Sequence, residues 1–321
     1  MNVAIIYNLV DDWNRVEIAS VVDSVTDVQR TLESLGHRVT LVRVDGGVRR
    51  FVEDLEALRP DVVVNLCEGY REWSAGESCI AGVLELLGIP YTGAGSTALA
   101  VALNKPLSKE LFTARQIPTP RFAVYQQVPA DAPALTFPVI LKLAAEDASV
   151  GITAANVVAD TPSFFLRLRQ LLDEFKAPVL AEEFIDGREF TVAVFDGRAI
   201  LVEEIELNVE PRIVCFRAKW DTESPQFQNT VPVFAPAITE KQRDEMKRIA
   251  EQVYAVIGIR DYGRVDLRMN ALGDLYVLEA NPNPDISVGA GYRRSLEAAG
   301  IPFSDFVSRL IENAFQRGAG R

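Results

Sequence analysis

The sequence predicts an α/β protein that opens with a parallel, open sheet and continues into antiparallel strands, so that it is α+β overall. Three observations predict this fold class. Apolar β-rich runs alternate with helical segments over residues 3–66, a proline-rich connector reads Ile-Pro-Thr-Pro at 117–120, and two strands with a Gly-containing turn fill 261–285. The order strand, helix, strand, helix, strand is typical of a parallel sheet that binds ligands at the carboxyl ends of its strands.

The first part of the chain supplies the parallel sheet. Its apolar patterns predict strands at 3–7, 39–44 and 61–66, and helices at about 24–35, 51–58 and 77–87. Gly36 and Gly88 follow two of these helices, as is common at helix ends. The polar strand ends at 8–13 and 67–73 lack the Gly-x-Gly-x-x-Gly fingerprint, so nothing supports an NAD enzyme.

The middle and end of the chain are expected to be mainly antiparallel. The patterns predict helices at 105–116, 162–175, 240–257 and 302–315, an irregular segment at 207–236, and strands at 138–143, 152–157, 179–183, 187–194 and 199–206. Lys142 lies inside an apolar strand, where an unpartnered charge is costly. A ligand phosphate would supply the partner, and so would an ion pair with Glu182 or Glu183.

The late hairpin collects acidic side chains. With a turn at 270–273, Arg264 would lie opposite Glu279 and Asp266 opposite Val277. Asp266 and Glu279 would then be diagonal neighbours on one face, within about 8 Å, with Asn281 on the same side. Two carboxylates and an amide oxygen favour a hard cation such as Mg²⁺. The plain alternative is a solvated hairpin in which Arg264 forms a salt bridge with Glu279.

Composition narrows the class of protein. The length of 321 residues predicts about two domains, and a net charge of -12 argues against a nucleic-acid partner. Three scattered cysteines favour a reduced setting, and no apolar run approaches 18 residues, so we expect a cytoplasmic protein without a membrane partner. The single histidine, His37, argues against Ser-His-Asp catalysis, Cys-His catalysis and histidine-bound zinc.

Several motifs occur in a fixed order along the chain. They are Leu-Glu-Leu-Leu-Gly-Ile-Pro-Tyr-Thr-Gly-Ala-Gly at 84–95, Asn-Lys-Pro-Leu-Ser-Lys at 104–109, Phe-Pro-Val-Ile-Leu-Lys at 137–142, Ser-Val-Gly at 149–151, Glu-Glu-Phe-Ile-Asp-Gly-Arg-Glu-Phe-Thr-Val at 182–192, Ala-Lys-Trp at 218–220, Gly-Arg-Val-Asp at 263–266 and Leu-Glu-Ala-Asn at 278–281. Together, over roughly residues 60–315, they resemble the ATP-grasp superfamily and, more closely, the D-alanine:D-alanine ligase family.

The resemblance implies an ATP-grasp fold and a homodimer. It places an N-terminal α/β domain at 1–93, a central ATP-grasp subdomain at 94–181, and a C-terminal subdomain with the metal site at 182–321. It also implies that the chain binds ATP and two Mg²⁺ ions, which Mn²⁺ can replace, and amino acids or short peptides as substrates.

The resemblance assigns roles residue by residue. Phosphates would be bound by Lys105, Lys142, Lys219 and Arg264, and by the loop residues Ser149, Val150 and Gly151. Adenine and ribose would be bound by Glu182, Glu183, Ile185 and Glu189. The metal ligands would be Asp266, Glu279 and Asn281, with Glu279 bridging two ions. Arg264, Lys219 and Asp285 are the residues expected to act in catalysis.

The amino-acid pocket departs from the family pattern. The family's glutamate in the first-strand loop is missing from 8–13, its histidine is Cys67, its tyrosine is Trp220, the glycine after its proline is Asp285, and its acceptor serine is Ala290. Candidate substrate contacts are therefore Asp11, Asp12, Glu68, Arg71, Glu72, Trp220, Asn283 and Arg293. The plain alternative for each is a solvated side chain.

These patterns lead to one expected function and two alternatives. We expect an ATP-dependent carboxylate-amine ligase that forms an amide through an acyl phosphate, with substrates other than two D-alanines. The first alternative is a D-alanine:D-alanine ligase with a divergent pocket. The second is a nucleotide-binding regulator without ligase activity.

Overall fold

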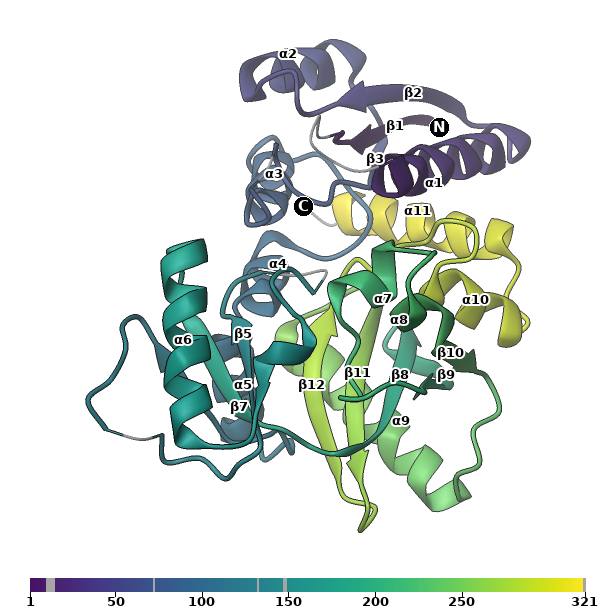
Figure 1. Cartoon of the computed structure of the whole chain (residues 1–321). Coiled ribbons are helices and arrows are strands. Elements are labelled where there is room, and N and C mark those ends of the chain that lie inside the picture. The colour runs from purple at the N-terminus through teal and green to yellow at the C-terminus, as the bar shows by residue number, and fades with distance from the viewer. Residues whose placement is uncertain (10–14, 72, 132, 147–148, 320–321) are drawn as a thin grey trace.

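The computed structural model of the chain describes residues 1–321 except 10–14, 72, 132, 147–148 and 320–321 (Figure 1). It contains three sheets of three, four and five strands with helices around them. No helix in the described part of the chain combines the length and apolar character needed to cross a bilayer.

The predicted parallel sheet is confirmed. Its strands are β1 (Asn2–Tyr7), β2 (Arg38–Arg43) and β3 (Val62–Asn65), in the order β2-β1-β3. The flanking helices are α1 (Arg15–Ser34), α2 (Val48–Leu58) and α3 (Gly76–Leu86). Helix α1 begins nine residues before the predicted start, and its buried residues include Val21, Val25, Val28 and Leu32.

The two faces of this sheet pack against different parts of the chain. Val3 and Ile5 face α1 and the C-terminal helices, whereas Ala4 and Ile6 face α2 and α3. This follows from the alternation of side chains along a strand. The sheet is therefore buried on both faces, as is usual for parallel strands.

The four-stranded sheet has the order β4-β7-β5-β6. Its strands are β4 (Phe122–Tyr125), β5 (Val139–Leu143), β6 (Val157–Val158) and β7 (Val179–Glu183), and α6 (Thr161–Phe175) packs against it. Helices α4 (Ser96–Leu103) and α5 (Lys105–Ala114) precede it in the chain. The predicted strand at 152–157 is wrong for most of its length. Thr153 and Asn156 cap a 3-10 turn at Ala154–Asn156, which leaves two residues to pair with β5.

The five-stranded sheet has the order β10-β9-β8-β11-β12. Its strands are β8 (Gly187–Phe195), β9 (Arg198–Leu207), β10 (Thr230–Val233), β11 (Tyr262–Asn270) and β12 (Leu275–Asn281), and α9 (Glu240–Ile257) covers one face. The expectation of an irregular 207–236 is wrong, because this segment holds α7 (Phe216–Trp220), α8 (Pro225–Gln228) and β10.

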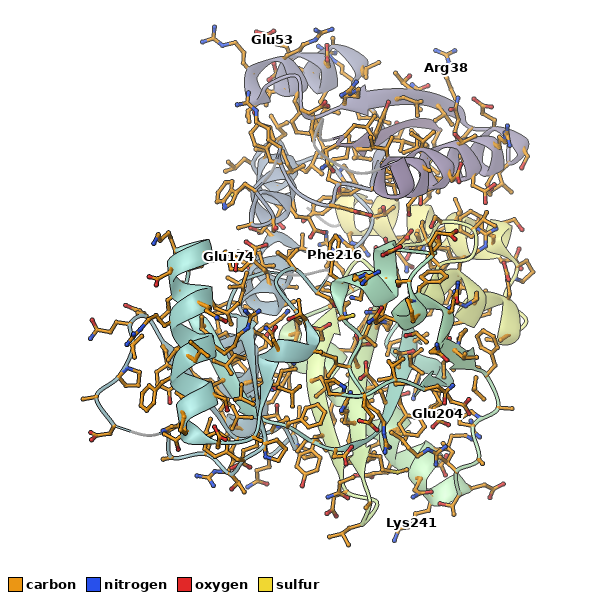
Figure 2. All side chains as sticks on the ribbon, viewed as in Figure 1. Arg38, Glu53, Glu174, Glu204, Phe216 and Lys241 are labelled. Atoms are coloured by element: carbon orange, nitrogen blue, oxygen red, sulfur yellow. The ribbon has the colours of Figure 1, made fainter. Side chains whose placement is uncertain are left out.

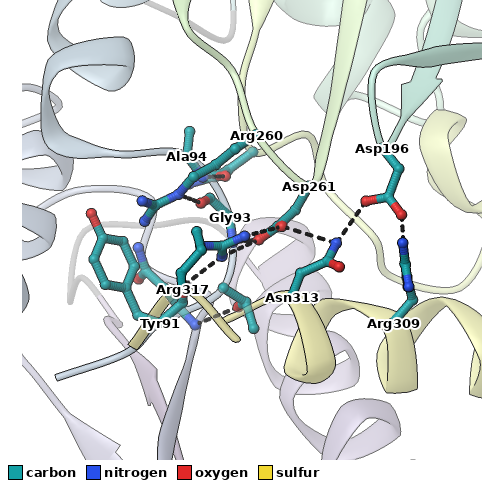
Figure 3. A network of polar contacts seen from close by, with 12 residues as sticks. Tyr91, Gly93, Ala94, Asp196, Arg260, Asp261, Arg309, Asn313 and Arg317 are labelled. Carbon is teal, nitrogen blue, oxygen red and sulfur yellow. Dashed lines mark hydrogen bonds and ion pairs between the residues drawn. The ribbon is translucent and has the colours of Figure 1, made fainter. Parts of the chain in front are cut away.

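The C-terminal helices return to the N-terminal sheet. Helices α10 (Gly291–Ala298) and α11 (Phe303–Ala319) lie between that sheet and the five-stranded sheet in Figure 1. Figure 3 shows that Asp261, just before β11, links α11 to the segment at Gly93. Its carboxylate accepts hydrogen bonds from Arg317 at 2.6 and 2.7 Å and from the Gly93 N–H at 2.8 Å. The predicted domain boundaries stay a prediction, and the one after residue 181 falls inside β7.

Candidate active site

The late hairpin brings the predicted metal ligands together. Asp266 pairs with Glu279, and Arg264 pairs with Asn281. The predicted register, with Arg264 opposite Glu279, is wrong because the pairing shifts by one residue after Asp266, which leaves Leu278 as an extra residue on β12. The two carboxylates consequently lie directly opposite each other instead of diagonally.

The turn of the hairpin accounts for the other residue by which the actual register differs from the predicted one. The Asn270 side chain accepts hydrogen bonds from the N–H groups of Leu272 and Asp274, both at 2.9 Å. Met269 therefore pairs with Leu275, one residue beyond the partner that a four-residue turn would give.

Asp266 is held by the arginine two residues before it. The carboxylate accepts hydrogen bonds from Arg264 Nε at 2.7 Å, Arg264 Nη2 at 2.8 Å and Asn281 Nδ2 at 3.1 Å. The alternative salt bridge from Arg264 to Glu279 is thus replaced by one to Asp266. Burial raises the pKa of Asp266, Arg264 offsets part of that rise, and the charge of Glu279 adds to it.

Glu279 is surrounded by ammonium groups from other elements. Lys105, at the start of α5, lies 3.0 Å from Glu279 Oε2. Burial would raise the pKa of Glu279, but the charges of Lys105, Lys219 and Lys142 outweigh it and hold that pKa well below its usual range. Of the predicted phosphate-binding lysines, Lys105 thus contacts the hairpin carboxylate directly, and Lys142 and Lys219 act on it through their charge.

Lys142 forms the ion pair with Glu182 that was expected as the alternative to a ligand phosphate. Its Nζ lies 3.2 Å from Glu182 Oε1, while Lys109 Nζ lies 3.0 Å from Glu182 Oε2. Glu182 and Lys109 each keep only 1% of their side chains exposed. Burial alone would raise the pKa of Glu182, yet the two ammonium groups lower it below its usual value. Glu182 thus stays ionised and holds Lys142 in place.

The other predicted nucleotide residues lie along the neighbouring strands. Arg268, only 3% exposed, binds Glu189 at 2.8 Å and the carbonyl oxygen of Ile185 at 2.8 Å. The Glu183 side chain accepts a hydrogen bond from the Thr136 N–H at 2.8 Å. Glu182, Glu183, Ile185 and Glu189 are thus gathered near the junction of the four-stranded and five-stranded sheets.

The predicted phosphate loop packs against the α7 segment. Ser149 Oγ donates a hydrogen bond to the carbonyl oxygen of Val214 at 3.0 Å. Ser149 and Gly151 both have positive φ angles, 62° and 71°, so the loop turns sharply on either side of Val150. Figure 2 places Phe216, the first residue of α7, near the middle of the molecule, whereas Glu53 and Lys241 mark opposite ends.

A small pocket of 20 Å³ lies beyond the metal ligands. The predicted residues Glu68, Asn283 and Asp285 line it, together with Val21, Ser24, Asn65, Leu66, Cys67, Tyr262, Pro284 and Ile286. These residues come from α1, from the end of β3 and the segment after it, from the start of β11 and from the loop after β12. Part of the predicted substrate set is therefore brought to one place.

Other predicted substrate residues lie elsewhere. Arg293 pairs with Asp27 at 3.1 Å and stacks on the Phe303 ring, and it does not line the pocket. Arg71 is exposed and lies over the Tyr70 ring. Asp11, Asp12 and Glu72 fall outside the described residues, and so does the side chain of Trp220.

A match to a protein-family model shows which family this chain belongs to. The model described as D-ala D-ala ligase C-terminus matches residues 111–312, which is more than half of the chain. The chain belongs to the D-alanine–D-alanine ligase family. As a member of this family, it is an ATP-dependent ligase that forms carbon–nitrogen bonds, and its fold is the ATP-grasp fold.

Relatives resemble the chain in sequence, and a solved structure resembles it in fold. A D-alanine–D-alanine ligase of Gloeobacter violaceus is 32% identical over 89% of this chain and 92% of its own length. An uncharacterised protein of Sinorhizobium fredii is 28% identical over 91% of this chain and 88% of its own. The ATP complex of the Bacillus anthracis D-alanine–D-alanine ligase has a TM-score of 0.80 at 20% identity, covering 100% of this chain and 99% of that one.

The ligase family implies Mg²⁺, and the donor set on the hairpin fits it. Asp266, Glu279 and Asn281 present carboxylate and amide oxygens on one face of the sheet, which are the ligands a hard cation prefers. Among the described residues, no cluster of three His, Cys, Asp or Glu side chains is arranged around a metal position. Ions held here would therefore take their other ligands from phosphate and water, as is usual for Mg²⁺.

Two buried residues of this candidate site were not predicted. Lys109 belongs to the quoted Asn-Lys-Pro-Leu-Ser-Lys motif and lies one helical turn after Lys105, so helical spacing would have placed both on one face. Arg268 shares its strand face with Arg264 and Asp266, and the same alternation that selected those two would have selected it.

Proposed function

We propose that this chain is a D-alanine–D-alanine ligase that joins two D-alanine molecules at the expense of ATP. The names of its relatives support this alternative better than the expected pair of different substrates, since a relative with that name aligns with 89% of the chain at 32% identity. The observation that carries the proposal is the hairpin on which Asp266 lies opposite Glu279, with Lys105 3.0 Å from Glu279.

The lysines and the carboxylates form a charge set that suits a metal-bound triphosphate. In this proposal Lys105 and Lys142 bind the α- and β-phosphates, and Lys219 and Arg264 bind the γ-phosphate. When ATP binds, the Lys105 ammonium would pair with phosphate instead of with Glu279. Glu279 would then act with Asp266 and Asn281 as a metal ligand. Two Mg²⁺ ions, when bound, would neutralise the charge of the phosphate oxygens.

The chain then has to position two reacting groups. A carboxylate oxygen of the donor attacks the γ-phosphorus, ADP leaves, and an acyl phosphate forms. The neutral amine of the acceptor attacks the acyl carbon, inorganic phosphate leaves, and the nitrogen loses a proton. Such transfers depend mainly on orientation and on charge neutralisation, which Arg264 and the lysines provide without a histidine.

The nucleoside would lie where β7 leads into β8. We assign the adenine contacts to Glu182, Glu183 and the backbone at Ile185, and the ribose contact to Glu189. Arg268 fixes this segment, because its guanidinium holds both Glu189 and the Ile185 carbonyl oxygen. The ion pairs of Glu182 with Lys109 and Lys142 make it a positioning residue for Lys142 as well.

The test is turnover of the full chain with Mg-ATP and D-alanine. The proposal predicts phosphate release in equal amount to D-alanyl-D-alanine, measured by mass, and no product when ATP or D-alanine is omitted. Products formed only from other amino acids in a panel of D- and L-forms would restore the expectation of different substrates. Tight Mg-ATP binding without product from any pair would favour a regulator.

A further inference from the structure

The pocket that Glu68 and Asp285 line is acidic and small. Its volume of 20 Å³ has room for about one group the size of water or ammonium. Glu68 and Asp285 line it, and none of the described residues that line it is Lys, Arg or His. A group that enters this pocket is therefore favoured if it carries a positive charge.

The pKa shifts of two neighbours report the same negative charge. Burial raises the pKa of Tyr262, and so do the charges of Glu77, Asp261, Asp285 and Glu68. Burial also raises the pKa of the Cys67 thiol, with Glu77, Glu68 and Asp45 adding to the rise. In both cases every named charge is a carboxylate.

Asp285 is held in one orientation by neighbouring groups. Oδ1 accepts a hydrogen bond from the Ser287 N–H at 2.7 Å, and Oδ2 accepts hydrogen bonds from Ser20 Oγ at 2.8 Å and Ser287 Oγ at 2.9 Å. The remaining contact, from Ser24 Oγ to Oδ1, is 3.5 Å long and therefore weak. Oδ1 thus keeps capacity to accept a stronger donor.

The same pocket contains an unused hydrogen-bond donor. Asn65, only 1% exposed, accepts a hydrogen bond from the Cys67 N–H through Oδ1, while its Nδ2 has no hydrogen-bond partner among the described residues. A buried amide nitrogen without a partner is costly and calls for an acceptor. A carboxylate at Asp285 and a free donor at Asn65 together suit a ligand that has both an ammonium group and oxygen atoms.

We propose that Asp285 recognises the ammonium group of the amino acid whose carboxylate is activated. This inference rests on the proposed function and names the residue that selects the donor. Asp285 follows Asn281 by four residues, which span at most about 14 Å, so it lies within reach of the place where a donor carboxylate meets the γ-phosphate.

The chemistry of the reaction favours the donor over the acceptor. The acceptor amine must be neutral to attack, and a neighbouring carboxylate would stabilise its protonated, unreactive form. The donor amine takes no part in bond formation, so a permanent ion pair with Asp285 costs the reaction nothing. Asp285 is therefore a specificity-determining residue for the donor.

Hydroxylamine in excess over D-alanine traps the acyl phosphate in place of the acceptor amine, so hydroxamate formation reports the donor step. With Mg-ATP, wild type should form the hydroxamate of D-alanine far faster than that of propionate, which has no amine. Asp285→Asn keeps the shape and most hydrogen bonds of the side chain but removes its charge. It should raise the KM for D-alanine at least tenfold, leave the KM for ATP within twofold, and reduce the preference over propionate by the same factor.

Two further outcomes separate the inference from the proposed function. An unchanged ratio of D-alanine to propionate in Asp285→Asn would overturn the role of Asp285 and leave the ligase proposal intact. Absence of hydroxamate in wild type would overturn the proposed function instead. In that case calorimetry with D-alaninamide, a cation without a carboxylate, decides the inference: binding to wild type that is lost in Asp285→Asn supports it, and equal binding to both contradicts it.

Discussion

At the scale of single residues, the site is a set of buried charges that neutralise one another in pairs. Asp266 is paired with Arg264, Glu279 with Lys105, and Glu182 with two lysines. Burying a charge without a partner costs several kcal/mol, so each pair depends on both of its members. Removing one member should therefore cost more than the pair itself contributes.

Lys109 offers the clearest case, because it lies deepest. Lys109→Met should lower the free energy of unfolding by about 3 kcal/mol, since it leaves one oxygen of the buried Glu182 without its ammonium partner. Arg50→Met, which removes an exposed pair with Asp54, is the control and should change it by less than about 1 kcal/mol. Urea unfolding measures both, and equal losses would contradict the account.

Sequence patterns found the charged residues but not all of their partners. Alternation along β11 placed Arg264 and Asp266 on one face, and Glu279 shares that face because the actual register differs from the predicted one by two residues, an even number. An ion pair of Lys142 with Glu182 or Glu183 was among the expectations, and the pairing of β5 with β7 decides for Glu182. The ion pair between Lys109 and Glu182 depends in turn on how α5 packs on that sheet.

At the scale of elements, the register of β11 decides where the carboxylates lie. Strand β8 holds β11 on the side away from β12 and pairs with it from Tyr262 to Asn270. A close contact at Gly187 allows this pairing to run to its end, because a Cβ atom there would lie 2.0 Å from the Met269 carbonyl oxygen. The glycine is required by space and not by a positive φ angle.

Gly187→Ala should therefore separate the ends of β8 and β11. We expect a loss of about 2 kcal/mol in the free energy of unfolding, because the obstacle is backbone and cannot rotate away. Gly82→Ala is the matched control, since Gly82 lies inside α3 with its nearest neighbour 3.9 Å away, and a helical alanine should be neutral or stabilising by about 0.5 kcal/mol. If both variants unfold like wild type, the close contact has no energetic weight.

The predicted elements failed where side chains replaced regular structure. Thr153 and Asn156 cap a short turn that a strand pattern over 152–157 could not reveal. The hairpin register escaped prediction for a related reason, because Asn270 closes the turn through its own side chain. Long strands and helices with a clear apolar period, such as β11 and α9, were predicted within a few residues.

At the scale of the whole molecule, the last helix locks the N-terminal sheet onto the rest of the chain. Asp261, whose side chain is 1% exposed, binds Arg317 of α11 and the Gly93 N–H, as Figure 3 shows. Arg317 also donates to the Tyr91 carbonyl oxygen at 2.9 Å. This network fixes the segment that carries Asn283 and Asp285, because the Asn283 side chain accepts a hydrogen bond from the Ala94 N–H at 2.9 Å.

Arg317→Ala should weaken the attachment of α11, because it removes the hydrogen bonds to Asp261 and to the Tyr91 carbonyl oxygen. We expect the free energy of unfolding to fall by about 2 kcal/mol, less than for a fully buried pair because Arg317 is 32% exposed. Adding Asp261→Asn should recover part of the loss, since the buried charge is then gone, and Arg309→Ala, which removes a more exposed pair with Asp196, should cost less than about 1 kcal/mol. Arg317→Ala and Arg309→Ala costing the same would argue against the lock.

The measurement that bears most directly on the central claim is Mg-ATP-dependent phosphate release by Glu279→Gln. Glutamine keeps the shape of the side chain but removes the charge that three lysines surround and that a metal ion would need. The account predicts that the rate of the folded variant falls at least about 100-fold, and that its free energy of unfolding also falls because Lys105 loses its carboxylate partner, while the exposed control Glu53→Gln keeps the wild-type rate. A Glu279→Gln protein as active as wild type would contradict it.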